Sequence, residues 1–392
     1  MEIWQEGKIK DFAEVKGGKR LPKGKQLITE RNTHPYIRIR DLGKSKTLEL
    51  TEDYEYVDDE TQESIARYIV DEGDILISVV GTIGLIGIVG KSLHKANQTE
   101  NCDKIINLKG LNRDYLYYYL ISSLGQEEIK RGTVGAVQPK LPLKNVMDIT
   151  IKYPSVETQE KIVTVLNAID NKIETNTMIN RNLSEQAKIL YKEWFIDFGP
   201  FEGEMPGDWH LGTVEEIIEL HDSKRKPLSG RQRDDMEKIY PYYGATSIMD
   251  YVDNYIFDGI YLLLGEDGSV IDTEGYPILQ YVFGKFWPNN HAHVITGKNG
   301  FSVEMLYLLF SLTNVQNIVT GAVQLKISQQ NLKTVEVVIP SYEVITEFDE
   351  MIQPIFREIR RLRTENEKLT TLRDNLLPKL MSGELDVSNL DI

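Results

Sequence analysis

Two stretches of the chain place apolar residues along one side of a predicted helix. Apolar or seam positions recur every three or four residues from 162 to 194 and again from 348 to 380, the spacing of a heptad repeat. Both stretches lack glycine and follow a Pro-Ser pair, which suits a helix entry. Since about 40 residues rise about 1.5 Å each, we expect two helices about 60 Å long. The seam positions are Ile162, Leu166, Ile169, Ile173, Asn176, Asn180, Leu183, Ala187, Leu190 and Trp194 in the first helix and Phe348, Ile352, Ile355, Ile359, Leu362, Asn366, Leu369, Leu372, Leu376 and Leu380 in the second.

The ends and the pairing of these helices follow from the same pattern. Gly199-Pro200 is expected to end the first helix and Gly383 to end the second. Pro354 has no N–H and is expected to kink the second helix near its start. The simplest cover for each apolar side is the other helix, in an antiparallel pair that would hold two globular regions at opposite ends. Asn180 and Asn366 lie on the seam, where a buried amide fixes the register or, alternatively, marks a locally solvated segment.

Outside these helices the chain alternates short strand and helix patterns. Residues 36–40 alternate like a half-buried strand, and residues 74–80 form an apolar run typical of a buried strand with glycines after it. Helical patterns occupy residues 114–124 and 303–312, and residues 260–264 predict a further strand. The predicted fold class is therefore mixed, α/β or α+β.

The chain also contains an internal repeat. Residues 135–155 are GAVQPKLPLKNVMDITIKYPS and residues 321–341 are GAVQLKISQQNLKTVEVVIPS, aligned at an offset of 186 without a gap. Nearer the N-terminus the offset is 205, since Trp4 and Gly7 match Trp209 and Gly212, and Lys19-Arg20 matches Lys224-Arg225. Such a repeat predicts two copies of one structural unit. Because loops absorb insertions, the difference in length indicates one scaffold that carries different loops.

The repeat and the helices divide the chain into four predicted regions. Two similar globular domains, residues 1–155 and 200–341, alternate with a central helical spacer, residues 156–199, and a C-terminal helical spacer, residues 342–392. This is a pseudo-two-fold arrangement within one polypeptide, and bivalent binding is its expected consequence.

Composition narrows the class of protein. The chain has 392 residues, of which 41% are hydrophobic, enough for substantial cores. It contains no apolar run long enough to span a membrane, and its N-terminal segment does not resemble a secretory signal. Cys102 is the single cysteine, which excludes a disulfide framework and a cysteine zinc site. We expect a soluble cytoplasmic protein.

The distribution of charge points to two special segments. The net charge of −15 argues by itself against nucleic acid as a partner. However, residues 16–25 and 224–233 each carry five basic residues and no acidic one, at matching places in the two repeats. A single basic run is usually a solvated surface loop. Because two runs occupy equivalent places in the repeats, contact with nucleic acid and solvated loops are equally good explanations of them. Tyr242 and Tyr243 follow the second basic segment and are candidates for stacking or hydrogen bonding to nucleic acid.

No catalytic constellation is recognisable in the sequence. Gly90-Lys91-Ser92 resembles the end of a phosphate-binding loop, but the motif requires glycine where residue 85 is leucine. His291 and His293 would share one face of a strand, yet no third ligand is evident, so we predict no metal site. No nucleophile–base pair and no methyltransferase, helicase or nuclease motif stands out, and we predict a binding subunit that is not an enzyme by itself.

Three motifs, together with the repeat, make the chain similar to the DNA-specificity subunits of type I restriction–modification systems. Residues 372–385, LRDNLLPKLMSGEL, resemble the family's C-terminal signature. The GAVQ segments at 135 and 321, each followed by a Pro-Ser pair, resemble the exit from a recognition domain. Residues 240–249, YPYYGATSIM, resemble a segment of the recognition domains, where the first copy has YIRIRDL at 36–42, a common variant. The resemblance covers essentially the whole chain.

The resemblance implies a subunit that reads a bipartite DNA target, with one half-site for each domain and a gap set by the helices. The implied partners are double-stranded DNA, two methyltransferase subunits and restriction (motor–nuclease) subunits. No cofactor is expected in this chain, since S-adenosylmethionine belongs to the methyltransferase partner, and ATP and Mg to the restriction partner. The residues predicted to bind partner subunits are Leu183, Leu190, Trp194, Leu376, Leu380 and Gly383. The residues predicted to contact DNA are Lys19, Arg20, Lys23, Lys25, Arg38, Arg40, Thr82, Lys140, Lys224, Arg225, Lys226, Arg231, Arg233, Tyr242, Tyr243, His291 and Lys326.

Two other classes of function remain open on the sequence. A tandem coiled-coil adaptor for protein interactions, without DNA specificity, explains the helices but not the paired basic segments. A stand-alone enzyme with its active site between the repeats lacks a recognisable catalytic constellation. Binding to duplex DNA that weakens steeply with salt would distinguish a DNA-reading subunit from both of these classes.

Overall fold

The two predicted long helices are present in the structure, a computed structural model that describes residues 3–321, 324–388 and 390. Helix α6 (Val156–Phe195) begins directly after Pro154-Ser155, and α11 (Tyr342–Ser382) begins directly after Pro340-Ser341, as predicted. Gly383 follows the end of α11 with a φ of +79°, a conformation that favours glycine at a helix end. Helix α11 continues through Pro354 without interruption. Within the described residues, no helix is long and apolar enough to cross a membrane.

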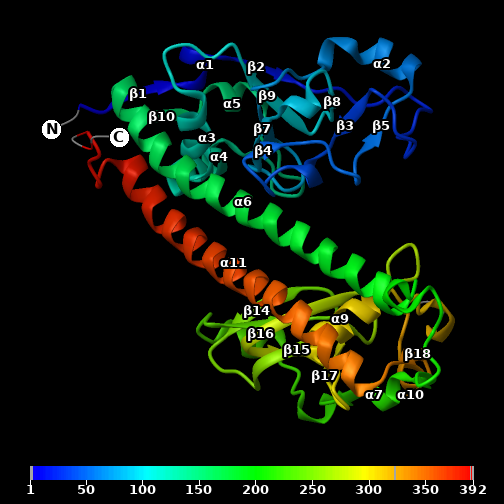
Figure 1. Cartoon of the computed structure of the whole chain (residues 1–392). Coiled ribbons are helices and arrows are strands. Elements are labelled where there is room, and N and C mark those ends of the chain that lie inside the picture. The colour runs from blue at the N-terminus through cyan, green and yellow to red at the C-terminus, as the bar shows by residue number, and fades with distance from the viewer. Residues whose placement is uncertain (1–2, 322–323, 389, 391–392) are drawn as a thin grey trace. The chain divides into compact units, whose positions relative to one another are not determined.

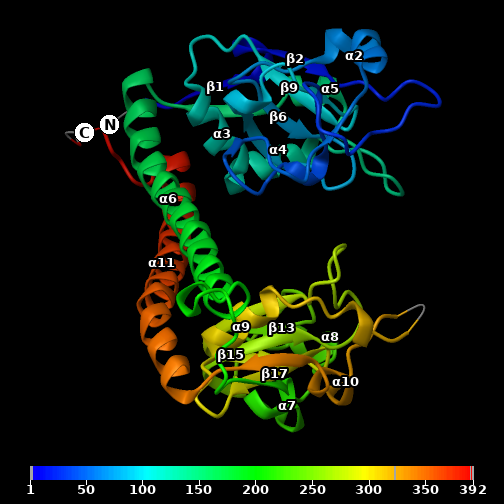
Figure 2. The same cartoon turned by 45° about the vertical axis from the view of Figure 1, so that its right-hand side comes forward.

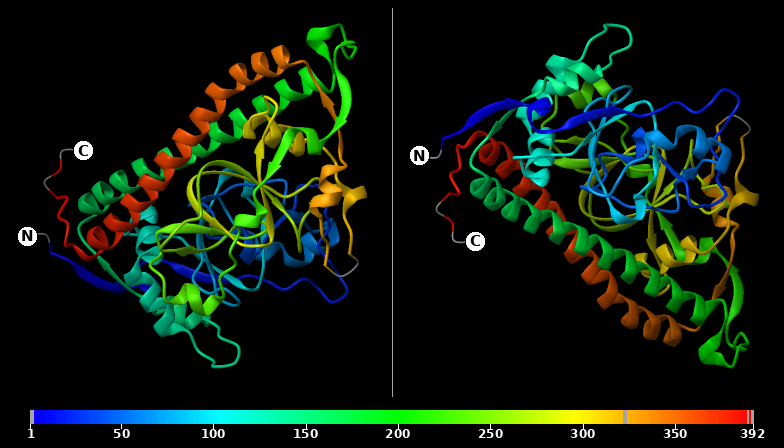
Figure 3. Two further views of the ribbon diagram at one scale, coloured as in Figure 1. Left: turned by 90° about the horizontal axis from the view of Figure 1, so that it is seen from below. Right: turned by 90° about the horizontal axis from the view of Figure 1, so that it is seen from above.

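Contacts group the chain into two units, and each unit combines one globular domain with half of each long helix. The first unit comprises residues 1–174 and 366–392, and the second comprises residues 175–365. In the first unit, the beginning of α6 lies alongside the end of α11 (Figures 1 and 3). In the second unit, the end of α6 lies alongside the beginning of α11. The helices therefore run antiparallel within each unit, which confirms the predicted pairing.

The predicted seam forms the buried stripe of this pairing. In the first unit, Leu166 and Leu380 are both fully buried in one core cluster. In the second unit, the rings of the seam residues Trp194 and Phe348 lie with their centroids 5.5 Å apart, and Phe195, next to the predicted seam, is the more deeply buried residue of α6. Leu372 departs from the pattern, because 46% of its surface remains exposed.

Polar contacts along the seam favour the register-fixing interpretation of Asn366. Asn366 Nδ2 donates a hydrogen bond to the carbonyl of Ile173 at 3.2 Å, and Arg373 forms an ion pair with Asp170 at 3.1 Å. Both contacts join α6 to α11 inside the first unit. A directional contact of this kind is satisfied at one register of the pair only.

The globular part of the first unit carries three small sheets. The largest has the strand order β2-β9-β6-β7-β4, a second has the order β5-β3-β8, and β1 pairs with β10. Helix α3 supplies Tyr115, Leu116 and Tyr118 to the same core cluster as the beginning of α6. The elements are β1 (Gln5–Lys8), α1 (Ile9–Phe12), β2 (Glu14–Gly17), β3 (Pro35–Ile37), η1 (Ile39–Asp41), β4 (Thr47–Leu48), β5 (Glu55–Tyr56), α2 (Asp59–Ile65), η2 (Ala66–Tyr68), β6 (Ile75–Ser78), β7 (Ile86–Val89), η3 (Lys91–Leu93), β8 (Asn97–Gln98), β9 (Cys102–Ile106), α3 (Arg113–Ile121), α4 (Ser123–Gly132), α5 (Leu143–Met147) and β10 (Thr150–Tyr153).

The globular part of the second unit is built on one larger sheet. Its strand order is β12-β17-β15-β16-β13-β14, and β11 pairs separately with β18. Helix α9 lies against this sheet (Figure 2) and supplies fully buried residues such as Leu306 and Phe310. The elements are η4 (Gly199–Phe201), β11 (His210–Thr213), α7 (Val214–Ile217), β12 (Ile218–Leu220), η5 (Asp222–Lys224), α8 (Gly230–Asp234), β13 (Tyr240–Tyr243), β14 (Ile248–Val252), β15 (Phe257–Gly265), β16 (Leu279–Pro288), β17 (Ala292–Gly297), α9 (Val303–Ser311), η6 (Gln316–Ile318), α10 (Gln329–Lys333) and β18 (Glu336–Ile339).

Both units share one scaffold, which confirms the internal repeat. Gln5 faces Tyr153 in the β1–β10 pair as His210 faces Ile339 in the β11–β18 pair, in agreement with both sequence offsets. The order β2-β9-β6-β7 in the first unit corresponds to β12-β17-β15-β16 in the second. Strands β3 and β13 each join a parallel neighbour at equivalent residues, Tyr36 and Tyr242.

Local hydrogen bonds shorten two predicted elements. The strand expected over residues 36–40 ends at Ile37, because the Asp41 carboxylate accepts a hydrogen bond from the Arg38 amide at 2.7 Å and turns the backbone into η1. The helix expected over residues 114–124 is two helices, since the Ser122 hydroxyl caps α4 at the Gly125 amide. The strands predicted over 74–80 and 260–264 and the helix predicted over 303–312 are confirmed as β6, β15 and α9.

Candidate nucleic-acid interface

The basic segment of the second unit is anchored through its backbone. Trp287 Nε1 donates to the Lys226 carbonyl at 2.6 Å, and the Leu228 amide donates to the Tyr242 hydroxyl at 2.9 Å. Lys224 and Lys226 are exposed, so their side chains are accessible to a ligand. Tyr242 itself is only 1% exposed. Its ring is therefore not available to stack on a base, and its observed role is to hold the basic segment.

Arg225 points into the domain, in contrast to the lysines on either side of it. One terminal nitrogen lies 2.7 Å from the Glu266 carboxylate and donates to the carbonyl of Ala292 at 2.6 Å. The Nε donates to the carbonyl of Asp222 at 3.1 Å. The side chain is 12% exposed. Its donors therefore face protein acceptors, although the sequence predicted a contact with DNA.

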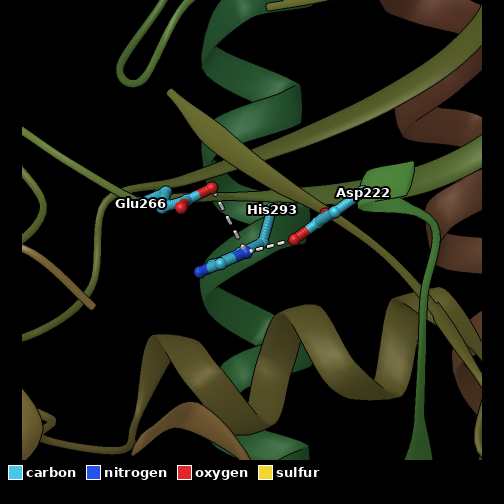
Figure 4. A group of neighbouring side chains, drawn as sticks. All are labelled: Asp222, Glu266 and His293. Carbon is cyan, nitrogen blue, oxygen red and sulfur yellow. Dashed lines mark hydrogen bonds and ion pairs between the residues drawn. The ribbon is translucent and has the colours of Figure 1, made fainter. Parts of the chain in front are cut away.

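Asp222, Glu266 and His293 form a cluster (Figure 4), and Arg225 pairs with both of its carboxylates. His293 is fully buried, with Nδ1 at 2.6 Å from the Asp222 carboxylate and Nε2 at 2.8 Å from the Ile327 carbonyl. Both oxygens are acceptors, so each ring nitrogen faces a hydrogen-bond acceptor. The Arg225 guanidinium lies against both carboxylates, as buried charges require partners.

The pKa of Asp222 reflects this arrangement. Burial alone would raise the pKa of its carboxyl, because the charged form loses hydration. The hydrogen bond and charge of His293, with hydrogen bonds from the Val294 amide and Gln329, outweigh burial and lower the pKa below its usual value. The Asp222 carboxylate is consequently ionised at neutral pH.

The three groups Asp222, Glu266 and His293 have the chemistry of a metal site, since imidazole and carboxylate are common ligands of divalent ions. However, Arg225 lies within 3.4 Å of Asp222 and 2.7 Å of Glu266. The Nε2 of His293 faces the Ile327 carbonyl, and Lys326 lies 3.3 Å from Glu266. Protein cations therefore neutralise the two carboxylates, and the prediction of no metal site stays a prediction.

Two predicted residues, His291 and Lys326, form the accessible rim of the cluster. The His291 side chain is 43% exposed, and its Nδ1 lies 2.5 Å from the Asp267 carboxylate. Lys326 is 49% exposed and lies 3.3 Å from Glu266. The backbone joins both to the cluster, because the Glu266 amide donates to the His291 carbonyl and the Ile327 amide donates to the Glu266 carbonyl. The neighbouring Ala322 and Val323 of the GAVQ motif lie outside the described residues.

The remaining predicted residues of the second unit differ in exposure. Arg231 is exposed in α8. Arg233 is paired with Asp250 at 2.8 Å and lies over the Tyr242 ring, with 16% of its side chain exposed. Tyr243 is half-buried and packs against Phe286. Arg231 is thus the more accessible cation of this helix.

The basic segment of the first unit is held similarly but faces outward. The buried Tyr36 donates its hydroxyl hydrogen to the Lys19 carbonyl at 3.2 Å, as Tyr242 holds the corresponding segment in the second unit. Arg20 keeps 83% of its side chain exposed and has an ion pair with Glu100 at 2.8 Å. Lys23 is exposed, while Lys25 is paired with Asp58 and Glu60.

The other predicted residues of the first unit fall into two groups. Arg38 and Arg40 both pair with Glu55. Thr82 is exposed in the turn after β6, where its carbonyl accepts a hydrogen bond from Ser78 at 2.6 Å. The exposed Lys140 bridges to Val80, two residues from Thr82. The structure therefore pairs Lys140 with the strand end that precedes Thr82, and it places the two arginines around a shared carboxylate.

The residues predicted to bind partner subunits lie mainly within the chain's own cores. Leu380 is fully buried, and Leu183, Leu190, Trp194 and Leu376 are partly buried against core clusters. Gly383 approaches Trp4 so closely that a Cβ on it would lie 2.6 Å from the indole nitrogen. Their observed role is packing, because seam positions of a helix pair are the positions that the pair buries.

Sequence reasoning missed the acidic residues of the cluster, Asp222, Glu266 and Asp267, and the amide of Gln329 that donates a hydrogen bond to Asp222. A signal existed in the acidic pair between Gly265 and Gly268, which directly follows a buried strand. Acidic side chains at the end of a buried strand need a cation as a partner, and Arg225 of the repeated Lys-Arg motif was a candidate. No sequence pattern connected the two segments.

At the place that corresponds to Asp222 and His293, the first unit has a different pair of residues, Gly17 and Asp103. Strand register sets Gly17 opposite Asp103, where the second unit has Asp222 beside His293. Asp103 is 4% exposed, and its Oδ2 accepts no hydrogen bond from the described residues. Burial alone raises the pKa of the Asp103 carboxyl to about 6. The first unit therefore carries a buried carboxyl that forms no ion pair with any residue the structure describes.

Replacing Asp103 with asparagine is expected to stabilise the first unit at pH 7 and not at pH 4. The raised pKa means that the folded chain holds the proton more tightly, so the ionised form costs stability above pH 6. At pH 7 we expect a gain of about 3 kcal/mol in the free energy of unfolding, since a pKa of about 6 lies roughly two units above the usual 3.8 and one unit corresponds to about 1.4 kcal/mol. Thermal unfolding of D103N and the parent chain at both pH values measures the difference. An equal change at both pH values would contradict the assignment to ionisation.

Comparisons with known proteins agree with the repeat and the fold. The family model for the type I restriction modification DNA specificity domain matches residues 1–185 and 206–371. The chain is 26% identical over 418 residues to the type I restriction enzyme MjaIX specificity subunit of Methanocaldococcus jannaschii, across 99% of this chain and 94% of that protein. It is 33% identical over 142 residues to the putative type I restriction enzyme specificity subunit S.HindORF215P of Haemophilus influenzae, across 36% of each. The crystal structure of a type I restriction–modification S subunit from M. genitalium has the same fold, with a TM-score of 0.57 at 18% identity across 97% of this chain and 96% of that one.

The family model covers both copies of the repeat and most of the chain. It also covers the two basic segments and the ionic cluster described above. The chain therefore belongs to the family of type I restriction modification DNA specificity domains.

Proposed function

We propose that this chain is the specificity subunit of a type I restriction–modification complex and that each globular domain reads one half of a bipartite DNA target. The observation that carries the proposal is the duplication of one scaffold with different side chains at equivalent places. Both copies hold a basic segment by a buried tyrosine, Tyr36 or Tyr242. The residues around the two segments differ, as they must if the half-sites differ in sequence.

The basic segments support DNA as the ligand despite the acidic net charge. Lys19, Arg20 and Lys23 in the first unit and Lys224 and Lys226 in the second are exposed. Contacts of such cations with phosphates position a protein on a duplex, and base contacts then provide specificity. The alternative of a coiled-coil adaptor without DNA specificity leaves the paired segments unexplained.

We assign no catalytic role to the chain itself. The relatives are named specificity subunits of type I restriction enzymes. In the proposed complex, S-adenosylmethionine binds the two methyltransferase subunits, while ATP and Mg bind the restriction subunits. The complex acts in the cytoplasm, where the DNA is accessible.

The outer sides of the long helices are the proposed docking surface for these partners. Exposed apolar side chains on α6 and α11 support this assignment, notably Met178 and Ile189 at 66% and Leu372 at 46%. They replace the buried seam residues as docking candidates, because a partner can bury only surface that is still accessible.

Mapping methylated adenines in DNA from cells that carry this chain with its methyltransferase partner tests the proposal. We expect one target sequence of two specific half-sites around a gap of fixed length. Cells that lack this chain and retain the methyltransferase provide the control. Methylation without sequence preference, or a target with a single uninterrupted site, would contradict the proposal.

A further inference from the structure

The geometry of the ionic cluster points to a division of labour within the second basic segment. We propose that Arg225 does not contact DNA but is a positioning residue, which ties the segments carrying Lys224, Lys226, His291 and Lys326 into one preformed DNA-reading surface. This inference rests on the proposed function and adds which side chains read and which side chain holds them.

Arg225 connects segments that are far apart in the sequence. It follows η5, and its guanidinium contacts the carboxylate of Glu266 after β15 and the carbonyls of Asn290 and Ala292 at the start of β17. Its Nε also donates to the carbonyl of Asp222. A planar fork with five donors suits such a set of separated acceptors, whereas the single ammonium of lysine does not.

The cluster extends the connection to the two accessible residues of the rim. Glu266 lies between Arg225 and Lys326, at 2.7 and 3.3 Å from their respective nitrogens. The next residue, Asp267, holds His291 at 2.5 Å. His293 joins Asp222 to the carbonyl of Ile327, which directly follows Lys326. Lys326 and His291 therefore each have a backbone or side-chain link to the buried cluster.

The charge of the cluster also argues that Arg225 is not a phosphate contact. Turning its guanidinium outward would leave Glu266 and Asp222 buried without this cation, and an uncompensated buried charge is strongly destabilising. The exposed fractions of the side chains agree with this, since Arg225 is 12% exposed whereas Lys326 is 49% and His291 43% exposed. The side chains that DNA can reach without rearrangement are those of the rim and of the exposed Lys224 and Lys226.

The first unit provides an internal comparison, because Arg20 occupies the position that corresponds to Arg225. Its side chain is 83% exposed, and its ion pair is with Glu100, which is 30% exposed. Gly17 and Asp103 stand where the second unit has Asp222 and His293. The same Lys-Arg motif therefore directs its arginine outward in one domain and inward in the other.

Four variants of the full-length chain, assembled with its methyltransferase partner, test the proposal on duplex DNA that contains the mapped target. The variants are R225K, the double variant R225M/E266M, R20K and R20A. We expect R225K to lower the discrimination at the second half-site by about tenfold, the value of one lost base contact, and to leave the first half-site unchanged. A role in fold stability alone would shift the melting temperature without this asymmetry between half-sites.

The dependence of affinity on salt distinguishes positioning from phosphate contact. One lost phosphate contact lowers the slope of log affinity against log salt by about 0.9. We expect R20A to show this loss, R20K to retain the parental slope and the parental discrimination, and R225M/E266M to retain the parental slope. The double variant removes the buried cation and its anion together, so the domain keeps its fold without an unpaired charge.

Either of two results would overturn the inference. One is parental discrimination by R225K, and the other is a slope lowered by about 0.9 in R225M/E266M, as expected for a direct phosphate contact. A parental complex without any sequence preference would instead contradict the proposed function, and would be recognised before any variant is compared.

Discussion

Replacing residues 200–341 with the corresponding region of another type I specificity subunit is expected to change one half of the DNA target and to leave the other half unchanged. All predicted reading residues of the second unit, from Lys224 to Lys326, lie inside this range. The first domain and both long helices lie outside it, so the first half-site and the docking surface are retained. The methylated sequence in cells that carry the hybrid subunit measures the result.

The packing of the second unit determines how this exchange must be designed. Tyr191 and Phe195 of α6 and Phe348 of α11 belong to the same core cluster as the exchanged domain. Buried aromatic residues of this size do not tolerate a change of shape on the facing surface, since cores are closely packed. The donor should therefore carry aromatic residues at the three equivalent positions, and the junctions should fall at Gly199-Pro200 and Pro340-Ser341, outside the helices.

The reciprocal exchange of residues 1–155 is the matched control, and it should change the other half-site alone. A hybrid that alters both half-sites, or a folded and active hybrid that alters neither, would refute the assignment of one half-site to each domain.

Replacing Arg360 with alanine is expected to destabilise the second unit by about 3 kcal/mol, because it leaves a buried carboxylate without its cation. Arg360 lies 2.6 Å from Glu304 of α9, and the two side chains are 19% and 4% exposed. The Tyr281 hydroxyl also lies 2.6 Å from the same carboxylate oxygen. This ion pair fastens the recognition domain to α11, so its loss should also loosen the domain on the helix.

Unfolding in urea, followed by tryptophan fluorescence, measures this loss. Three of the four tryptophans, Trp194, Trp209 and Trp287, belong to the second unit, so the signal reports mainly on that unit. R361A is the matched control, since Arg361 is 57% exposed and pairs with Glu358 and Glu365 on its own helix. We expect a change below about 0.5 kcal/mol for the control, as is usual for exposed pairs. Equal stability of R360A and R361A would show that the buried pair does not hold the domain.

In the first unit, a different cation pairs with the carboxylate at the equivalent helix position. Asp114 of α3, at the position that corresponds to Glu304, pairs with Lys46 at 2.7 Å and accepts a hydrogen bond from Asn167 of α6 at 3.1 Å. The cation comes from the globular domain in this unit and from the long helix in the other. A shared position for the carboxylate with separate sources for the cation is consistent with one ancestral contact that each copy neutralised in its own way.

The helical spacing of apolar residues and the internal repeat were sufficient to predict the scaffold. The seam from Ile162 to Trp194 predicted the buried side of α6, because an amphipathic helix buries the stripe that recurs every three or four residues. The offsets of 186 and 205 predicted equivalent strands, and the registers of β1–β10 and β11–β18 agree with both. The predicted strand at 36–40 was too long, since a side-chain cap at Asp41 competes with the sheet and leaves no periodic signal.

The candidate site was predicted only in part. The basic segments were recognisable because they occupy matching places in the two repeats, and Lys224, Lys226, His291 and Lys326 are accessible in the structure. The direction of each side chain was not recognisable. Arg20 and Arg225 belong to the same repeated motif, yet one is 83% exposed and the other 12%.

By itself, the sequence determined that this protein has two copies of one scaffold and two long paired helices, since periodicity and repetition are properties of the chain order. Only the tertiary structure decided which cations face outward and which are neutralised within the domain. That choice depends on partners such as Glu266 and Asp222, which strand pairing brings to Arg225 across distant segments. Buried charge must be balanced by whatever group the fold places within a few ångströms, and such neighbours are not encoded by spacing along the chain.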